Sequence, residues 1–401
     1  MKNRGRNCVV VVLLWFTLLL SIAYSKAKRV CFHLNDMNYR GSTRAAFDYA
    51  INTELLLGHK SIIIYPSESA SSIALPLFIK QFNGSVYSYD PDPAQYQVSF
   101  GRRLSIGGRF MVKLIESVGC DVLYLMKYGT LDSPPSYPAS FETSVPIAVH
   151  AVFVYQPHYR ANVIPLNSFI NPSLGPSASL PHIVSPPRAL SSLLISRILS
   201  LRRSVGIPDQ GPLVMCGFGG ADSFDIPDAE RATLLLASVY TIQELHFMFM
   251  GLAPNFLLHE LEESHHDRSM PFTSTWYPNL HVLPPAVDDL SREAFIGSCD
   301  AMLHARSIGE TFGLAIAEFS IRNKPVLVFN DPTLRADSRE HLRILGKKAF
   351  LYSNVLDLQA IIADWVQQGV PINDYYAYSE FSPSQVRSCT LSCSHFKVLV
   401  I

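Results

Sequence analysis

The stretch CDAMLHARSIGETFGLAIAEFSIRNKPVLVFN, residues 299–330, decides the fold of this chain. It begins with an apolar run at 299–303 and ends with another in NKPVLVFN at 323–330, and both are typical of strands buried on two faces. A glycine-containing loop and a helix-length segment from about Gly313 lie between them. Strand, loop, helix and strand in this order form the repeating unit of a parallel α/β sheet.

The loop and the helix start of this stretch have the features of an anion site. Backbone N–H groups at the opening of a helix, together with its dipole, favour negative charge. Gly309 and Gly313 keep the backbone permissive, so phosphate oxygens can approach closely. Arg306 adds a charged donor. The stretch therefore predicts a site for a nucleotide diphosphate.

Two carboxylates, Glu310 and Glu318, flank this helix start. Eight steps of helical rise would separate them by about 12 Å, which is long enough to span a diphosphate. One carboxylate could then accept hydrogen bonds from sugar hydroxyls and the other from ribose hydroxyls.

The rest of the chain repeats the alternation of short apolar runs and helix-length segments. This alternation stops at about 155–188, where the sequence is rich in proline and serine, and it resumes with PLVMCGFGG at 212–220. We therefore expect an α/β protein with two Rossmann-like domains that face each other across a cleft. The expected divisions are a leader at 1–28, a first domain at 29–188, a linker helix at 189–206, a second domain at 207–370 and a tail at 371–401.

The leader has basic residues on both sides of an apolar run at 8–24, which predicts a signal peptide or a signal anchor. We expect entry into the secretory pathway, in the endoplasmic reticulum or Golgi, either lumenal or membrane-associated through residues 8–24. Lys plus Arg equals Asp plus Glu at 33 each, so no overall charge favours nucleic acid as a partner.

Cysteine and histidine patterns do not predict a metal site. Four cysteines lie in or beside apolar runs and are expected to be buried free thiols: Cys31, Cys120, Cys216 and Cys299. Cys389 and Cys393 have no second pair at zinc spacing, and the histidines of HELEESHHDR at 259–268 are expected in a solvated loop.

Glu310 to Glu318, within GETFG and the following KPV strand, resembles the E-x7-E motif of family-4-like retaining glycosyltransferases of the GT-B fold. By that resemblance, Glu310 is the catalytic carboxylate that contacts the donor sugar, and Glu318 binds the ribose. The diphosphate would bind to the backbone of four consecutive residues: Thr311, Phe312, Gly313 and Leu314.

The first domain also resembles this family. The text from Asn35 to Ile64 is similar to its opening strand, loop and long helix, which implies that Gly41 faces the donor. His150 ends the strand VPIAVH, where the resemblance implies a catalytic position near the reacting sugar or the acceptor. His304 is expected at the donor. A buried histidine satisfied by a backbone carbonyl is the alternative interpretation for His150 and His304.

Two features depart from the family pattern. The loop after the first strand of the second domain usually carries Arg and Lys, but here it reads CGFGGADSFDIPDAER and has glycines at Gly217, Gly219 and Gly220. The C-terminal text SPSQVRSCTLSCSHFKVLVI starts plausibly at Ser382 but is otherwise a poor helix for the usual return to the first domain.

The resemblance implies a retaining, metal-independent hexosyltransferase without a cofactor, whose partners are a nucleotide-diphosphate sugar as donor and a glycan, lipid or protein as acceptor. The missing loop cation leaves open an alternative, a catalytically weak GT-B protein that binds sugar nucleotides. A GT-B sugar-nucleotide epimerase is a third hypothesis, for which the chain offers no clear set of cleft carboxylates and histidines.

Overall fold

The computed structural model describes residues 27–38, 41–69, 74–90, 96–99, 102–105, 109–127, 143–152, 163–167, 180–220, 223–264, 266–267, 269–286 and 288–386. The apolar run at 8–24 and the pair Cys389 and Cys393 lie outside these residues. Among the described helices, none is both long and apolar enough to cross a bilayer.

The first domain is a parallel six-stranded sheet in the order β3-β2-β1-β6-β7-β8. Its strands are β1 (Arg29–His33), β2 (Lys60–Pro66), β3 (Val86–Tyr89), β6 (Val122–Lys127), β7 (Ile147–Ala151) and β8 (Val163–Asn167), and a separate hairpin joins β4 (Tyr96–Ser99) to β5 (Arg102–Ser105). Its helices are α2 (Gly41–Leu57), α3 (Ala74–Gln81) and α4 (Arg109–Ser117). Apolar clusters cover both faces, with α2 and α3 on one and α4 on the other.

The second domain is a seven-stranded sheet in the order β11-β12-β10-β9-β13-β14-β15, parallel except for the edge strand β11. Its strands are β9 (Leu213–Phe218), β10 (Leu245–Met250), β11 (Phe272–Thr273), β12 (Leu280–Leu283), β13 (Ala301–His304), β14 (Val326–Phe329) and β15 (Ala349–Tyr352). Its helices are α5 (Ser192–Ser204), α6 (Pro227–Val239), α7 (Asn255–Glu263), α8 (Asp289–Ser298), α9 (Leu314–Ser320), α10 (Glu340–Leu345) and α11 (Val355–Gln368).

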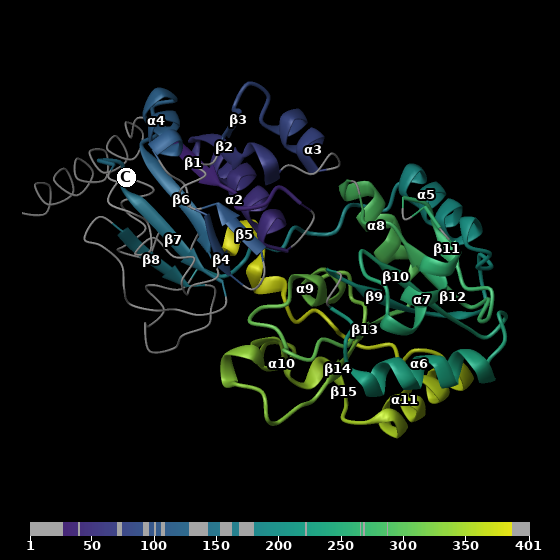
Figure 1. Ribbon diagram of the computed structural model, residues 1–401. Helices are drawn as coiled ribbons and strands as arrows, with labels where there is room; N and C mark the ends of the chain where they lie inside the picture. The colour runs from purple at the N-terminus through teal and green to yellow at the C-terminus, as the bar shows by residue number, and fades with distance from the viewer. Residues whose placement is uncertain are drawn as a thin grey trace, which may run out of the picture.

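Two lobes result, the first purple to blue and the second teal to green in Figure 1. The prediction of two Rossmann-like domains is confirmed. The helix expected as a linker is α5, and it packs on α8 of the second domain, where Ile198 fills the space beside Gly297. The short strands β8 and β11 lie in segments where the sequence pattern did not predict strands.

The prediction of four buried free thiols is wrong. Cys31 is bonded to Cys120, and Cys216 is bonded to Cys299. Each disulfide joins the central strand of one sheet, β1 or β9, to the turn that precedes the neighbouring strand, β6 or β13. The thiols meet because these strands are adjacent in space, although 89 and 83 residues separate them in sequence.

The prediction of a solvated loop at 259–268 needs correction. The text from 259 onward is not a loop throughout, because α7 extends to Glu263. The C-terminal segment does return to the first domain, as the yellow ribbon of Figure 1 shows. Tyr378 and Phe381 lie in the core of the second domain, a helical turn begins at residue 383, and Val386 lies in the core of the first domain.

Candidate functional site

A cavity of about 400 Å³ lies between the two domains. The first domain contributes residues of α2 and α3, and the second contributes the loops after β9 and β12 and the starts of α8 and α9. The two loops follow the carboxyl ends of parallel strands of the second sheet, where open α/β sheets bind ligands. Three residues predicted for the donor site line the cavity: Gly41, Leu314 and Glu318.

Gly41 and Leu314 meet across the domain boundary. A Cβ atom on Gly41 would lie 3.8 Å from Leu314 Cδ1, and Leu314 packs against the cores of both domains. Helix α9 begins at Leu314, and its N-cap, Gly313, has φ of 79°. Gly313 offers no side-chain acceptor, so the first N–H groups of α9 have no cap from that residue.

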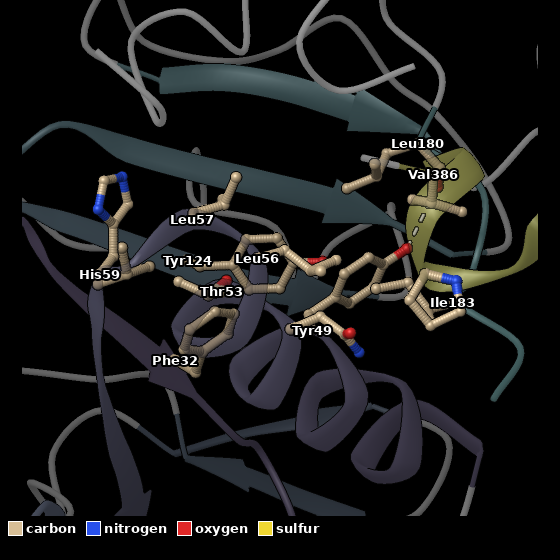
Figure 2. Close-up of a pocket in the computed structure, with 13 residues that line it drawn as sticks. Phe32, Tyr49, Thr53, Leu56, Leu57, His59, Tyr124, Leu180, Ile183 and Val386 are labelled. Carbon is tan, nitrogen blue, oxygen red and sulfur yellow. Dashed lines mark hydrogen bonds between the residues drawn. The ribbon is translucent and has the colours of Figure 1, made fainter. Parts of the chain in front are cut away.

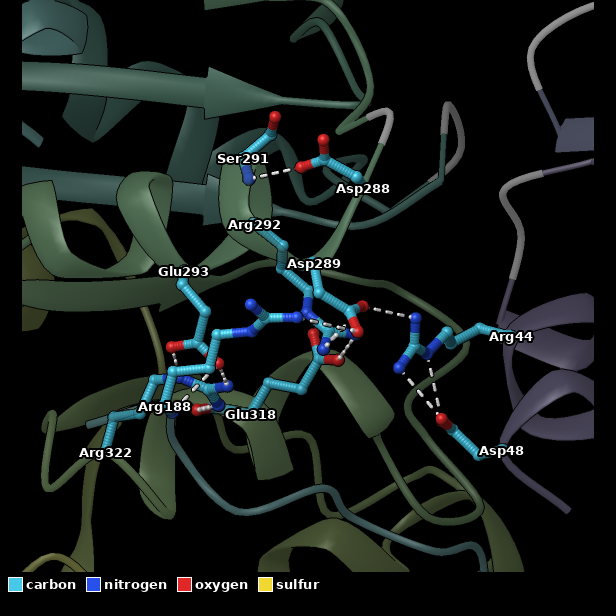
Figure 3. Close-up of polar contacts among 10 residues, drawn as sticks. All are labelled: Arg44, Asp48, Arg188, Asp288, Asp289, Ser291, Arg292, Glu293, Glu318 and Arg322. Carbon is cyan, nitrogen blue, oxygen red and sulfur yellow. Dashed lines mark hydrogen bonds and ion pairs between the residues drawn. The ribbon is translucent and has the colours of Figure 1, made fainter. Parts of the chain in front are cut away.

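Helix α8 brings charged side chains to the cavity. Asp288 caps this helix by accepting a hydrogen bond from Ser291 N at 2.7 Å, and Asp289 follows in the first turn. Arg292 lies one turn further, with Nη2 3.2 Å from Asp289 Oδ1. Its Nη1 is 2.7 Å from Glu318 Oε1. The predicted ribose ligand is thus held by a guanidinium in this structure (Figure 3).

Arg44 of α2 extends these contacts into the first domain. It binds Asp48 on its own helix through two hydrogen bonds of 2.8 and 3.0 Å, and its Nη1 lies 2.7 Å from Asp289 Oδ1 of the second domain. Burial raises the pKa of the Asp48 carboxyl, although Arg44 opposes this effect. Burial also acts to raise the pKa of Asp289, but Arg44 and Arg292 outweigh it and lower that pKa.

The glycine-rich loop after β9 contributes Phe218, Gly219 and Gly220 to the cavity lining. The missing cation of this loop does not leave the cavity without positive charge, because Arg44 and Arg292 line it too. Sequence reasoning missed both arginines. An Arg four residues before an Asp and an Asp three residues before an Arg were the available signals, and such helix pairs are common on surfaces.

Glu310 lies in a different environment, outside the residues that line the cavity. Arg306 Nη1 is 2.9 Å from Glu310 Oε1, and His304 Nε2 is 3.6 Å from the same oxygen, an ion-pair distance longer than an ordinary hydrogen bond. Burial alone would raise the pKa of the Glu310 carboxyl, but His304 and Arg306 outweigh it and lower the pKa to about 2. The structure thus brings together His304, Arg306 and Glu310.

The remaining residues of the GETFG segment have structural contacts. Gly309, with φ of 65°, passes so close to Ser338 that a Cβ would lie 2.1 Å from the Ser338 carbonyl oxygen. Thr311 Oγ1 donates to the Val152 carbonyl of the first domain at 3.0 Å. Phe312 is buried against three aromatic rings, those of His182, Tyr378 and Phe381. Of Thr311 and Phe312, only the backbone remains a candidate for contact with a ligand.

His150 is fully buried at the end of β7. Its Nδ1 lies 2.5 Å from the Tyr124 hydroxyl, and its ring is 5.5 Å from that of His182. Burial, and secondarily His182, holds the pKa of His150 well below its ordinary value. The structure therefore separates His150 from the cavity that Glu318 lines.

A second, much smaller pocket of about 60 Å³ lies beside Tyr124, the hydrogen-bond partner of His150 (Figure 2). Its lining is mostly apolar and includes Phe32, Tyr49 and Tyr124 together with Val386 of the C-terminal segment. It is too small for a sugar nucleotide and belongs to the contact between that segment and the first domain.

Comparison with solved structures identifies the arrangement. HepE of Anabaena, in complex with UDP and glucose, matches with a TM-score of 0.56 and 14% identity over 92% of this chain and 97% of its own. A glycosyltransferase from Rickettsia africae matches with a TM-score of 0.58 and 12% identity, over 94% of this chain and 96% of its own.

The fold is GT-B. MnaA of S. aureus, in a co-structure with UDP, also shares it, with a TM-score of 0.52 and 12% identity over 93% of this chain and 98% of its own. No protein-family model and no curated protein matches the chain. At these identities the likeness establishes the GT-B fold, and the function has to be argued from the site.

Proposed function

We propose that this chain is a retaining, metal-independent glycosyltransferase that moves a hexose from a nucleotide-diphosphate sugar to a glycan, lipid or protein acceptor. The observation that carries the proposal is the interdomain cavity of about 400 Å³, which is lined by Gly41, the start of α9 and Glu318 together. Its volume suits a small-molecule ligand. The UDP complexes of HepE and MnaA support a nucleotide-diphosphate ligand in a GT-B protein.

The donor would lie along α9. Glu318 would accept hydrogen bonds from the ribose, and the backbone from Thr311 to Leu314 would bind the diphosphate, as the E-x7-E resemblance implies. Leu314 and Ala315 at the cavity wall support this direction. Arg44 and Arg292 line the same cavity, but each is already paired with a carboxylate, so phosphate binding would depend mainly on the backbone N–H groups.

The transfer itself would depend on Glu310. Its lowered pKa of about 2 keeps the carboxylate ionised at neutral pH, so it can accept hydrogen bonds from sugar hydroxyls. The acceptor oxygen would form its bond to the anomeric carbon on the face from which the diphosphate leaves, and the acceptor proton would pass to a donor phosphate oxygen. His150, whose low pKa favours the neutral ring, would act near the sugar or acceptor only if the buried region opens.

The alternative is a catalytically weak GT-B protein that binds sugar nucleotides. The ion pairs favour it, because Arg44 and Arg292 are already bound to carboxylates and Arg306 is bound to Glu310. A cation that is shared with a carboxylate stabilises a leaving diphosphate less, which would cost on the order of a few kcal/mol in the barrier.

We also propose that the protein resides in the secretory pathway, in the endoplasmic reticulum or Golgi. Two disulfides, Cys31–Cys120 and Cys216–Cys299, support an oxidising compartment. The apolar run at 8–24 supports either a cleaved signal peptide or a membrane anchor.

The test is the hydrolysis and transfer activity of the full-length chain with a panel of UDP- and GDP-sugars. We expect turnover that falls at least about 100-fold in Glu310→Ala, as when one group that stabilises the reacting centre is removed. Nucleotide-induced thermal stabilisation without turnover would favour the weak binder. Absence of both would overturn the proposal, and turnover unaffected by Glu310→Ala would move the sugar site elsewhere.

A further inference from the structure

A continuous series of ion pairs connects the proposed ribose ligand to the other domain (Figure 3). Glu318 contacts Arg292 at 2.7 Å, Arg292 contacts Asp289 at 3.2 Å, and Asp289 contacts Arg44 of α2 at 2.7 Å. Glu318 lies on α9, Asp289 and Arg292 on α8, and Arg44 in the first domain. We call these four residues the interdomain ion chain.

Arg292 holds Glu318 in a defined position at the cavity wall. The side chains of Arg292 and Glu318 are only 8% and 12% exposed, so solvent screens their contact weakly. The contact uses Glu318 Oε1, and within the described part of the chain no other side chain is hydrogen-bonded to this carboxylate. Oε2 therefore remains an acceptor for a ligand that enters the cavity.

The ion chain suits a neutral hydroxyl better than a phosphate. Each guanidinium in the interdomain ion chain already contacts carboxylates, so the positive and negative charges balance locally. The atom that is left to bind a ligand is Glu318 Oε2, which is a hydrogen-bond acceptor. A ribose hydroxyl can donate to such an oxygen, whereas a phosphate would meet negative charge on Glu318 and Asp289.

We propose that Arg292 is a positioning residue that fixes the Glu318 carboxylate for hydrogen bonding to the ribose of the donor, and that Arg44 couples this ribose recognition to closure of the two domains. The inference rests on the proposed function. A hydrogen bond to a fixed carboxylate is worth about 1.5–3 kcal/mol, or roughly 10- to 100-fold in affinity. A carboxylate released from Arg292 can rotate, and it then loses discrimination between ribose and deoxyribose.

The test measures the affinity of the full-length chain for UDP and 2′-deoxy-UDP, and for GDP and 2′-deoxy-GDP, by calorimetry. The wild-type chain is expected to prefer the ribonucleotide by at least about 10-fold. Arg292→Gln should bring this ratio below about 3-fold, and Arg44→Gln should lower it less, because Arg292 keeps Asp289. Arg188→Gln is the matched control: Arg188 lies 3.8 Å from Asp289 but does not line the cavity, so the ratio should not change.

The ratio of the affinities for the ribonucleotide and the 2′-deoxyribonucleotide is informative even where a variant loses overall affinity, because a purely structural defect weakens the binding of both ligands alike. Should Arg292→Gln fail to fold, Arg292→Lys, which keeps the charge but not the planar fork, should give a ratio between those of wild type and no preference. Wild-type binding of UDP or GDP with no ribose preference, or an unchanged ratio in the Arg292 variants, overturns this inference alone. A wild-type chain that binds no nucleotide overturns the proposed function with it.

Discussion

Glu310 is a carboxylate that two partners keep ionised inside the protein. Because the pKa of Glu310 in the folded state is about 2, below its value of about 4.3 in an unfolded chain, folding is stabilised by the ionised form. This contribution, at most about 3 kcal/mol, is fully present above about pH 4.3 and is lost as the pH falls toward 2.

Glu310→Gln should therefore destabilise the protein at pH 7, and near pH 3, midway between the two pKa values, its effect should fall to about half. Urea unfolding of both proteins across this range measures the effect. Glu116→Gln, at an exposed position on α4, is the control and should leave the free energy of unfolding at pH 7 nearly unchanged. An equal loss of stability at pH 7 and pH 3 would show that the Glu310 charge does not contribute.

The two glutamates of the motif were predictable from the sequence, but their environments were not. The spacing of Glu310 and Glu318 and the helix start at Gly313 indicated a ligand-binding turn, and the structure places Glu318 and Leu314 at the cavity. Arg292 comes from the preceding helix and Arg44 from the other domain, so no local pattern connects them with Glu318.

At the scale of elements, the loop between β13 and α9 depends on a glycine. Gly309 has φ of 65°, and a Cβ there would approach the Ser338 carbonyl oxygen to 2.1 Å. Gly309→Ala should cost at least about 3 kcal/mol, since it adds a steric clash with backbone to the left-handed conformation.

Gly206, which follows α5, is a matched control for this substitution. Its φ is 75°, it ends the helix with Ile207 N bonded to the Arg202 carbonyl, and a Cβ there meets nothing within 4 Å, so Gly206→Ala should cost only about 1–2 kcal/mol. Thermal or urea unfolding compares the two variants. Equal costs would show that the loop moves away from Ser338 without penalty.

The disulfides give a second prediction at this scale. The double substitution Cys216→Ala and Cys299→Ala should lower the free energy of unfolding by about 2–4 kcal/mol, because the bond closes a long loop of the unfolded chain. Urea unfolding with and without reductant measures this. Recovery of Cys216 and Cys299 as free thiols in a non-reducing peptide map would contradict it.

The alternation of apolar runs predicted the main strands of both sheets because strands buried on two faces have continuous apolar sequences. It did not predict the disulfides, since cysteines in such runs look the same whether bonded or free. The edge strand β11 has only two residues, Phe272 and Thr273, and was too short to recognise.

At the scale of the whole molecule, the C-terminal segment joins the two domains. Tyr378 donates from its hydroxyl to the Phe312 carbonyl at 2.6 Å, and Val184 N donates to the Phe381 carbonyl at 2.9 Å. Val386 then packs in the core of the first domain. The sequence of the C-terminal segment has a low helix propensity. Tertiary packing therefore fixes its return to the first domain, and a local sequence pattern cannot predict such packing.

Val386→Asp tests this bridge. The pocket that Val386 lines is mostly apolar, so a carboxylate there would lose its hydration, and we expect a loss of stability on the order of several kcal/mol or release of the segment from the first domain. Ile372→Asp is the control, because Ile372 lies in the same segment but is fully exposed. Scanning calorimetry should show a lower melting temperature for the first-domain transition in Val386→Asp. The melting temperature should not change in Ile372→Asp. If donor-site closure depends on the bridge, Val386→Asp should also weaken UDP binding, whereas unchanged melting and binding would mean that the segment contributes nothing to the coupling of the domains.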